Sequence, residues 1–465
     1  MVRKKGSLLL MLCASLLLTA SCDGRQPNSP ESSKKQAQVL SLAERQQVAE
    51  KLHPDMVRAQ NRFGLRLHEE LAKTAKPEGN TLMSPYSIFT ALALAYQGSG
   101  GNTAEEMARM LGIETIGKEQ ANASVRTLYT LLGDAGSGVR LNSANSVWYS
   151  RGMEIKNSFI RTAKDSYHAD VQAVDFTEKG TVKKINDWVS RHTRGKIPGV
   201  LDQAPTPDTL AILLNTVYFN GAWQSPFDPK DTQDGKFTLG DQTTKQVPMM
   251  RRSGMFEYKQ TPEAQAIRLP YGDGRLNMLI VLPAGGHSLA DVMNTIRKAP
   301  SIWQARFDHA SGEIRLPRFK AESSLELREA LIAMGMKQAF DPAAADFTAM
   351  TGAKPLFVSS VLHKMVLDVN EEGTEAAAVT EMAMAGSAPP AGRFEMNVDH
   401  PFSSASKTAK PGFGCSWGRL KIRRKTEHNQ RSTYHRVQIR SYSNGSAGRF
   451  HNHNHPSNGW FALGV

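Results

Sequence analysis

The sequence predicts an α+β fold, in which helices and short strands follow one another in mixed order. Apolar residues recur at helical spacing between about residues 40 and 73, which indicates amphipathic helix. Short apolar or alternating runs bounded by Gly, Pro or Asn indicate strands at residues 211–218, 276–282 and 364–369. Because these elements do not repeat as regular strand–helix–strand units, the pattern favours α+β over a doubly wound sheet.

The first helical pattern is expected as two helices. Its apolar positions include Val48, Leu52, Phe63 and Leu67, and Pro54 lies between them. Proline has no backbone N–H and disrupts a helix interior, so one helix should end before Pro54. The chain of 465 residues exceeds the usual size of one domain, and a single large domain remains compatible with it.

The N-terminus has the pattern of a secretion signal. Basic residues 3–5 precede an apolar stretch, residues 8–18, which is too short for a typical membrane-spanning helix. Cys22 follows Thr-Ala-Ser, as in a bacterial lipobox. We expect residues 1–22 to be a lipoprotein signal peptide, Cys22 the acylated residue and residues 23–45 a polar tether, with ordinary signal cleavage as the alternative. The protein would then be secreted or attached to the cell envelope through a lipid anchor.

Charge and cysteine content bound the chemistry of the rest. After residue 402 there are eleven Lys and Arg residues and one acid, Glu427, so this segment carries most of the net charge of +13. The preceding chain has no basic excess that would favour nucleic-acid binding, and we expect no nucleic-acid partner. The three cysteines are Cys13, Cys22 and Cys415, so no internal disulfide is possible between residues 23 and 402.

Residues 370–380 read Asn-Glu-Glu-Gly-Thr-Glu-Ala-Ala-Ala-Val-Thr. From Thr374 onward, small residues fall on alternate positions, which predicts a strand with one buried face. The segment has few β-branched or aromatic residues, so its strand propensity is weak. Glu-Ala-Ala-Ala is also good helix sequence, and an Ala-rich helix is the alternative interpretation of the segment alone.

Four sequence blocks can be compared with known families. They are residues 80–107 (beginning Asn-Thr-Leu-Met-Ser-Pro-Tyr-Ser-Ile), 213–223 (Leu-Leu-Asn-Thr-Val-Tyr-Phe-Asn-Gly-Ala-Trp), 363–377 (ending Asn-Glu-Glu-Gly-Thr-Glu-Ala-Ala) and 399–402 (Asp-His-Pro-Phe). Their order and spacing are typical of serpins, and residues 46–402 resemble a serpin domain. The resemblance implies helices around three β-sheets, an exposed reactive-centre loop at about residues 373–393, and a monomer.

The resemblance also implies three groups of functional residues. The shutter, a buried hydrogen-bond cluster beneath the strands that part, would consist of Ser84, Ser87, Asn215 and His363. The breach, at the top of the central sheet, would consist of Arg318, Trp223 and Glu371. The hinge would consist of Glu371, Gly373, Thr374, Ala376, Ala377 and Ala378.

No catalytic constellation is expected. A hydrolase using Ser84 or Ser87 with His363 is the alternative, but the serines lack the glycines of a nucleophile elbow and no acid is placed to orient the imidazole. We therefore expect a chain that is not an enzyme and that needs no metal or cofactor.

The mechanism that the resemblance implies is suicide inhibition. A protease would cleave the loop, and the freed segment after Gly373 would insert into the central sheet and trap the acyl-enzyme. The reactive bond would be Ser387–Ala388, or Met384–Ala385 for a slipped loop. Small or unbranched residues there predict an elastase-, subtilisin- or chymotrypsin-like serine endopeptidase, or a papain-like cysteine protease. The alternatives are a non-inhibitory serpin-fold binding protein and an inactive product of a frameshifted gene.

The serpin pattern stops after Phe402. With permitted codon choices and a shift of one base, residues 403–423 can be reread as LFCIQDSETGFWLFMGKVENP, which resembles a serpin C-terminus. We therefore expect residues 403–465 to be a frameshifted, basic, disordered tail. The alternatives are a native nucleic-acid arm around residues 421–425 or a metal tract at the His-rich residues 451–455.

Overall fold

A computed structural model describes residues 40–74, 80–134, 136, 138–299, 303, 305, 307–353, 355–374, 393–408 and 414–420. All of them belong to one compact unit, residues 39–465. Among these residues, no helix is both long and apolar enough to span a bilayer.

The two helices expected around Pro54 are confirmed. Helix α1 (Leu42–Glu50) begins with a capping box, in which Ser41 and Glu44 each bond the other's backbone N–H. Helix α2 (Pro54–Thr74) begins at Pro54, where the missing N–H leaves no bond unmade. The other helices are α3 (Pro85–Gly98), α4 (Gly101–Leu111), α5 (Lys118–Gly133), α6 (Asn157–Tyr167), α7 (Gly180–His192), α8 (Leu289–Lys298), α10 (Arg328–Ala333) and α11 (Thr348–Thr351), with short 3₁₀ turns η1 (Pro229–Asp231) and η2 (Gln338–Phe340).

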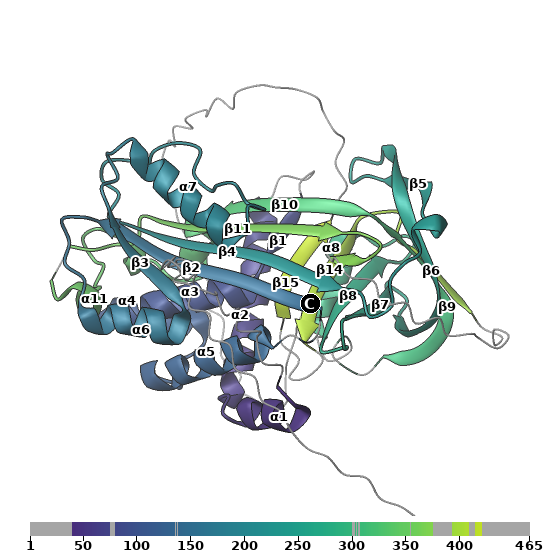
Figure 1. Cartoon of the computed structure of the whole chain (residues 1–465), viewed down its shortest axis with the longest axis horizontal. Coiled ribbons are helices and arrows are strands. Elements are labelled where there is room, and N and C mark those ends of the chain that lie inside the picture. Colours follow the sequence, from purple (N-terminus) through teal and green to yellow (C-terminus); the bar gives the residue numbers. More distant parts are fainter. Residues whose placement is uncertain are drawn as a thin grey trace, which may run out of the picture. The chain divides into compact units, whose positions relative to one another are not determined.

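The central sheet has six strands, and its longest strands lie side by side in Figure 1. In sheet order the strands are β10 (Phe319–Glu326), β11 (Ser360–Val369), β12 (Gly373–Thr374), β4 (Ala211–Ala222), β2 (Val139–Ser150) and β3 (Ala169–Val174). Strands β11 and β4 pair directly and in parallel from Ser360–Ile212 to Val366–Tyr218. Beyond that point the two-residue strand β12 lies between them. The strands predicted at residues 211–218 and 364–369 are thus confirmed as β4 and β11.

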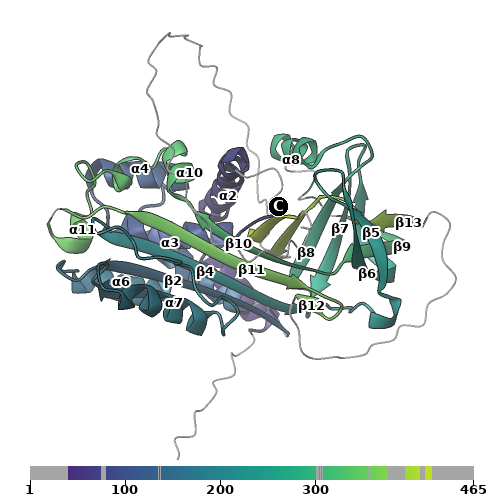
Figure 2. The ribbon, with the colours of Figure 1, turned by 90° about the horizontal axis from the view of Figure 1, so that it is seen from above.

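Helices cover both faces of the central sheet. Alternate residues of β4 point to opposite sides, as the two-residue period of a strand requires. Ile212 and Leu214 pack with Trp188 and Val189 of α7, whereas Leu213 and Val217 belong to the main core that contains α3. Figure 1 shows α7 above these strands and α3 below them, and Figure 2 views the same strands from the α7 side.

The second sheet has nine strands. In order they are β1 (Thr81–Met83), β15 (Gly414–Leu420), β14 (Phe402–Thr408), β8 (Leu276–Pro283), β7 (Ala264–Tyr271), β6 (Thr244–Gln260), β9 (Asp308–Pro317) and β13 (Phe394–Asn397), while β5 (Gln233–Thr238) pairs with β6. Strand β8 confirms the strand predicted at residues 276–282. The long strand β6 pairs with β5 and β9 and also with β7, so it joins two of the three expected sheets into one.

The expectation of a disordered tail after Phe402 is wrong for its first part. Residues 402–408 form β14 and residues 414–420 form β15, and these strands connect β8 to β1. Ladder hydrogen bonds are made by the backbone, so a polar sequence can still fill this place in the sheet. Residues 421–465 lie outside the described residues.

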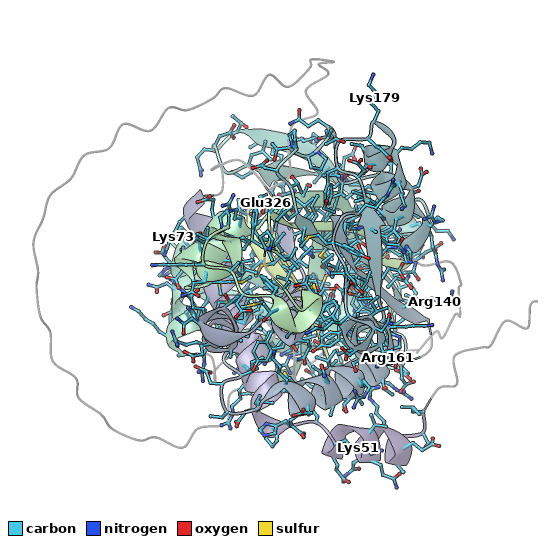
Figure 3. All side chains as sticks on the ribbon, turned by 90° about the vertical axis from the view of Figure 1, so that its left-hand side faces the viewer. Lys51, Lys73, Arg140, Arg161, Lys179 and Glu326 are labelled. Carbon is cyan, nitrogen blue, oxygen red and sulfur yellow. The ribbon has the colours of Figure 1, made fainter. Side chains whose placement is uncertain are left out.

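The side chains of β14 retain the mark of the unusual sequence. Ser403, Ser404 and Ser406 are 2%, 3% and 2% exposed, and they lie opposite Val281, Ile280 and Met278 of β8. Lys407 is also buried. By contrast, the charged residues labelled in Figure 3, such as Lys51 and Lys179, are exposed on the surface. Strand β14 therefore places three hydroxyls opposite apolar side chains of β8, and it buries an amine opposite the polar Asn277.

Candidate functional site

The four predicted shutter residues form one buried hydrogen-bond chain. The backbone N–H of Ser84 donates to Nε2 of His363 at 3.1 Å, and Nδ1 of His363 lies 2.6 Å from Oδ1 of Asn215. The Nδ2 group of Asn215 donates to Oγ of Ser87 at 2.9 Å. This chain connects the start of α3 to β11 and β4, the two strands that pair in parallel.

The shutter imidazole is neutral. His363 is 0% exposed, and burial lowers its pKa to about 3. Since Nε2 accepts the Ser84 N–H, the proton resides on Nδ1 and is donated to Asn215. The basic nitrogen that a hydrolase would use to activate a serine is therefore already occupied by a backbone N–H.

Two shutter residues were missed by the sequence analysis. Asn145 and Ser143 of β2 join the cluster: Nδ2 of Asn215 donates to Oδ1 of Asn145 at 2.6 Å, and Ser143 and Ser87 share a hydroxyl–hydroxyl bond. The register that places Asn145 opposite Asn215 pairs β2 with β4, which are distant in sequence. Polar residues are common throughout β2, so its sequence alone did not single out Asn145 and Ser143. Thus the shutter spans three strands and one helix.

At the other end of the central sheet, Trp223 holds the backbone of the hinge. Its indole Nε1–H donates to the carbonyl of Asn370 at 3.0 Å, and its backbone N–H donates to the carbonyl of Glu372 at 2.9 Å. The side chain is 3% exposed. These bonds confine the turn between β11 and β12.

The predicted breach pair is present, with unequal exposure. Nη1 of Arg318 lies 3.6 Å from Oε1 of Glu371, and the side chains are 50% and 9% exposed. Oγ1 of Thr232, which the sequence analysis missed, donates to the same Glu371 oxygen at 2.9 Å. Glu371 is therefore held mainly by a partly buried hydrogen bond, and the half-exposed Arg318 adds a weaker charge interaction.

The first hinge residues already lie between the central strands. Gly373 and Thr374 pair with Ala222 and Gly221 of β4, and Thr374 also pairs with Val369 of β11. A Cβ on Gly373 would lie 2.2 Å from the Gly221 carbonyl oxygen, so only glycine fits. The sequence prediction that a strand begins here is confirmed for these residues.

The residues that follow the predicted reactive loop are fixed by charge and stacking. The guanidinium of Arg251, which bonds Glu313 at 2.8 Å, lowers the pKa of Glu313 to about 2, and Arg393 lies 3.7 Å from the same carboxylate. Next to Arg393, the ring of Phe394 stacks on Tyr258 at 3.9 Å. The loop is thus anchored to the second sheet where it re-enters the described chain.

Several predicted positions lie outside the described residues. They are Cys22, the hinge alanines Ala376, Ala377 and Ala378, and both proposed bonds, Ser387–Ala388 and Met384–Ala385. Within the described part, no three His, Cys, Asp or Glu side chains gather as a candidate metal site.

Comparison with known proteins identifies this arrangement. A family model described as Serpin (serine protease inhibitor) matches residues 58–419. Intracellular coagulation inhibitor 2 of Tachypleus tridentatus is 37% identical over 340 residues, which cover 71% of this chain and 82% of that protein. Leukocyte elastase inhibitor of Bos taurus is 34% identical over 356 residues, which cover 74% and 93%.

A solved structure agrees in fold. Serpin48, a highly specific serpin in the insect Tenebrio molitor, matches with a TM-score of 0.72 and 30% identity, covering 80% of this chain and 98% of its own. The family match extends to residue 419, so β14 and most of β15 occupy serpin positions despite their sequence. The chain belongs to the serpin family.

Proposed function

We propose that this chain inhibits a serine endopeptidase by sacrificing its reactive loop. The observation that carries the proposal is the position of β12, whose two residues are already paired between β4 and β11. A segment that continues β12 has a defined entry point and a defined direction into the sheet. The names of the relatives, which include an elastase inhibitor and a coagulation inhibitor, support the inhibitor class.

The covalent step follows ordinary serine protease chemistry. The protease serine oxygen bonds the carbonyl carbon of Ser387, or of Met384 for the slipped loop, and the peptide C–N bond breaks so that the next residue leaves as an amine. Insertion of the segment after Gly373 then moves the acylated protease along the sheet. Roughly 13 inserted residues at about 3.3 Å each correspond to about 40 Å.

The target class follows from the side chains at the two bonds. A small serine or an unbranched methionine suits elastase-, subtilisin- or chymotrypsin-like enzymes, with a papain-like cysteine protease as the alternative. No nucleic acid or cofactor has a part in the mechanism.

The test is formation of a covalent complex. Full-length protein incubated with elastase or subtilisin should give a complex that survives denaturing gel electrophoresis. The matched control is Thr374→Arg, which leaves the cleavage region intact but forces a charge into a position that is 0% exposed. This variant should be cleaved without trapping the protease.

A relaxed serpin-fold binding protein predicts a different outcome. It would be cleaved without complex formation, and cleavage would leave its melting temperature unchanged. An inhibitor instead gains stability when the freed loop inserts. Cleavage of the wild type without complex and without thermal stabilisation would therefore replace the inhibitor proposal with the binding-protein alternative.

We also propose that Cys22 anchors the protein to a membrane. The support is the sequence pattern, because residues 1–39 are outside the described residues. Fatty-acid labelling should be lost in Cys22→Ser and retained in Cys13→Ser. Release of an unlabelled wild-type protein would instead mean ordinary signal cleavage and a secreted inhibitor.

Finally, we propose that the sequence after Phe402 results from a frameshift. The buried serines of β14 support this, because the rereading that codon choice permits would place Leu, Phe and Ile at the buried positions of Ser403, Ser404 and Ser406. The nucleotide sequence over codons 402–424 decides it: the neighbouring frame must encode the apolar serpin ending. Stops or polar codons there would make the tail native.

A further inference from the structure

The hydroxyl of Tyr271, at the end of β7, contacts the hinge directly. It lies 2.7 Å from Oγ1 of Thr374, and both residues are 0% exposed. A hydroxyl buried this deeply needs a partner, because an unsatisfied one carries the full desolvation penalty. The contact therefore links the nine-stranded sheet to the two hinge residues in the central sheet.

The tyrosine ring is fixed in place by its neighbours. It stacks on Trp223 with 4.5 Å between centroids and 8° between planes, and Phe219 packs edge-on at 5.1 Å. The same Trp223 binds the hinge backbone through Asn370 and Glu372. The position of the Tyr271 hydroxyl is thus fixed by its neighbours, so its hydrogen bond restrains the side chain of Thr374.

The pairing register of β12 decides which side chains of the segment that follows it face the core. A slip of one residue turns every strand side chain to the opposite face, and the segment after Gly373 alternates between small residues and a set that begins with Glu375. Strand β12 has only two paired residues to define that register. The hydrogen bond between Tyr271 and Thr374 adds a side-chain contact that also fixes this register.

We infer that Tyr271 is a positioning residue, whose hydroxyl keeps Thr374 in register between β4 and β11 so that loop insertion starts from an aligned end. This inference rests on the proposed function, because it assigns Tyr271 a part in insertion. The hydroxyl can also bond Ser406 of β14, since a hydroxyl both donates and accepts. Burial raises the pKa of Tyr271, so the hydroxyl keeps its proton.

The first test measures hinge opening in the free protein. Hydrogen exchange is followed at the amides of Asn370 and Trp223, which donate to the carbonyls of Gly373 and Glu372. In Tyr271→Phe and in Thr374→Val, exchange at these amides should accelerate roughly five- to tenfold, the value of one buried hydrogen bond. The double variant should exchange no faster than the faster single variant, because both changes remove the same bond.

The matched control is Tyr167→Phe. Tyr167 is another fully buried tyrosine, and its hydroxyl donates to the Ala93 carbonyl at 3.3 Å, away from the hinge. This variant should leave the two hinge amides within twofold of wild type. Hinge exchange that is unchanged in Tyr271→Phe and Thr374→Val, or equally accelerated in Tyr167→Phe, would overturn the inference whether or not the protein inhibits a protease.

The second test measures the outcome of cleavage by elastase. The rate of first cleavage should stay constant, while the ratio of cleaved to covalently trapped inhibitor rises several-fold in Tyr271→Phe and Thr374→Val and not in Tyr167→Phe. An unchanged ratio despite faster hinge exchange would reject the role in insertion. If the wild type forms no complex, the proposed function fails, and the exchange experiment alone then decides whether Tyr271 positions the hinge.

Discussion

The buried Lys407 should make this protein more stable at alkaline pH than at neutral pH. Lys407 lies on β14 opposite Asn277 of β8 and is 7% exposed. Burial, aided by the nearby Arg268 guanidinium, lowers the pKa of Lys407 to about 7. Between pH 7 and pH 10 the unfolded chain then binds more protons than the folded chain, so the free energy of unfolding rises with pH.

The magnitude follows from the two pKa values. With a pKa of about 7 in the folded chain and about 10.4 in the unfolded chain, Lys407 lowers the free energy of unfolding by about 4 kcal/mol at pH 7 and by about 1 kcal/mol at pH 9.5. Replacement Lys407→Met keeps an unbranched chain and removes the titrating amine. The variant should be more stable than wild type by about those amounts.

The assay is urea unfolding at several pH values between 7 and 9.5. Wild type should gain about 3 kcal/mol across this range relative to Lys407→Met. The control is Lys320→Met on β10, where the lysine is exposed and the change should matter little at any pH. Parallel curves for wild type and Lys407→Met would refute the reasoning, because they would mean that Lys407 titrates alike in the folded and unfolded chains.

Three further changes test the site and its supports. Between pH 7 and pH 4 the wild type should lose about 3 kcal/mol of unfolding free energy through His363, because burial lowers the pKa of His363 to about 3 in the folded chain. His363→Gln should remove this part of the pH dependence. An equal loss of unfolding free energy between pH 7 and pH 4 in the variant would contradict the prediction. Gly373→Ala should introduce a strain of about 1–3 kcal/mol that separates β12 from β4, and hydrogen exchange of the Trp223 amide should become faster. Unchanged exchange would mean that the backbone moves at little cost to remove the 2.2 Å contact between the new Cβ and the Gly221 carbonyl oxygen. Asp134→Asn should destabilise the protein by about 3 kcal/mol and increase hydrogen exchange in α1, because Arg45 and Arg275 both form ion pairs with this carboxylate, which is 5% exposed. The control is Asp187→Asn, at an exposed ion pair. Equal effects of the two changes would reject a stabilising role for the buried ion pairs of Asp134.

Local sequence patterns were enough to predict individual elements. Pro54 divides α1 from α2, and apolar runs bounded by turn residues mark β4, β8 and β11. These features depend on neighbours in sequence, such as a missing backbone N–H or a two-residue alternation. The shutter residues and the Arg318–Glu371 pair came from family resemblance, which carries spatial information that local pattern does not.

Residues that depend on strand register were not predictable in this way. Asn145 joins the shutter because β2 pairs with β4, and Tyr271 reaches Thr374 because the ends of β7 and β12 meet between two sheets. The error over residues 403–408 and 414–420, which were expected to be a disordered tail, had a different cause. The polar side chains of β14 argue against a core strand. Its backbone N–H and C=O groups nevertheless form the ladder hydrogen bonds with β8 and β15, and these bonds do not depend on the side chains.

The parallel pairing of β4 with β11 has a consequence for the free energy that strand insertion would release in the proposed mechanism. These strands share one ladder of seven residue pairs, whereas β12 runs antiparallel to both of them. A segment extending β12 along the same path would dissolve that single ladder and build two antiparallel ones, each somewhat stronger per residue than the parallel ladder it replaces. Between β4 and β11 the uncut sheet therefore holds one ladder, and in the proposed mechanism the cleaved loop would supply the strand that turns this one ladder into two.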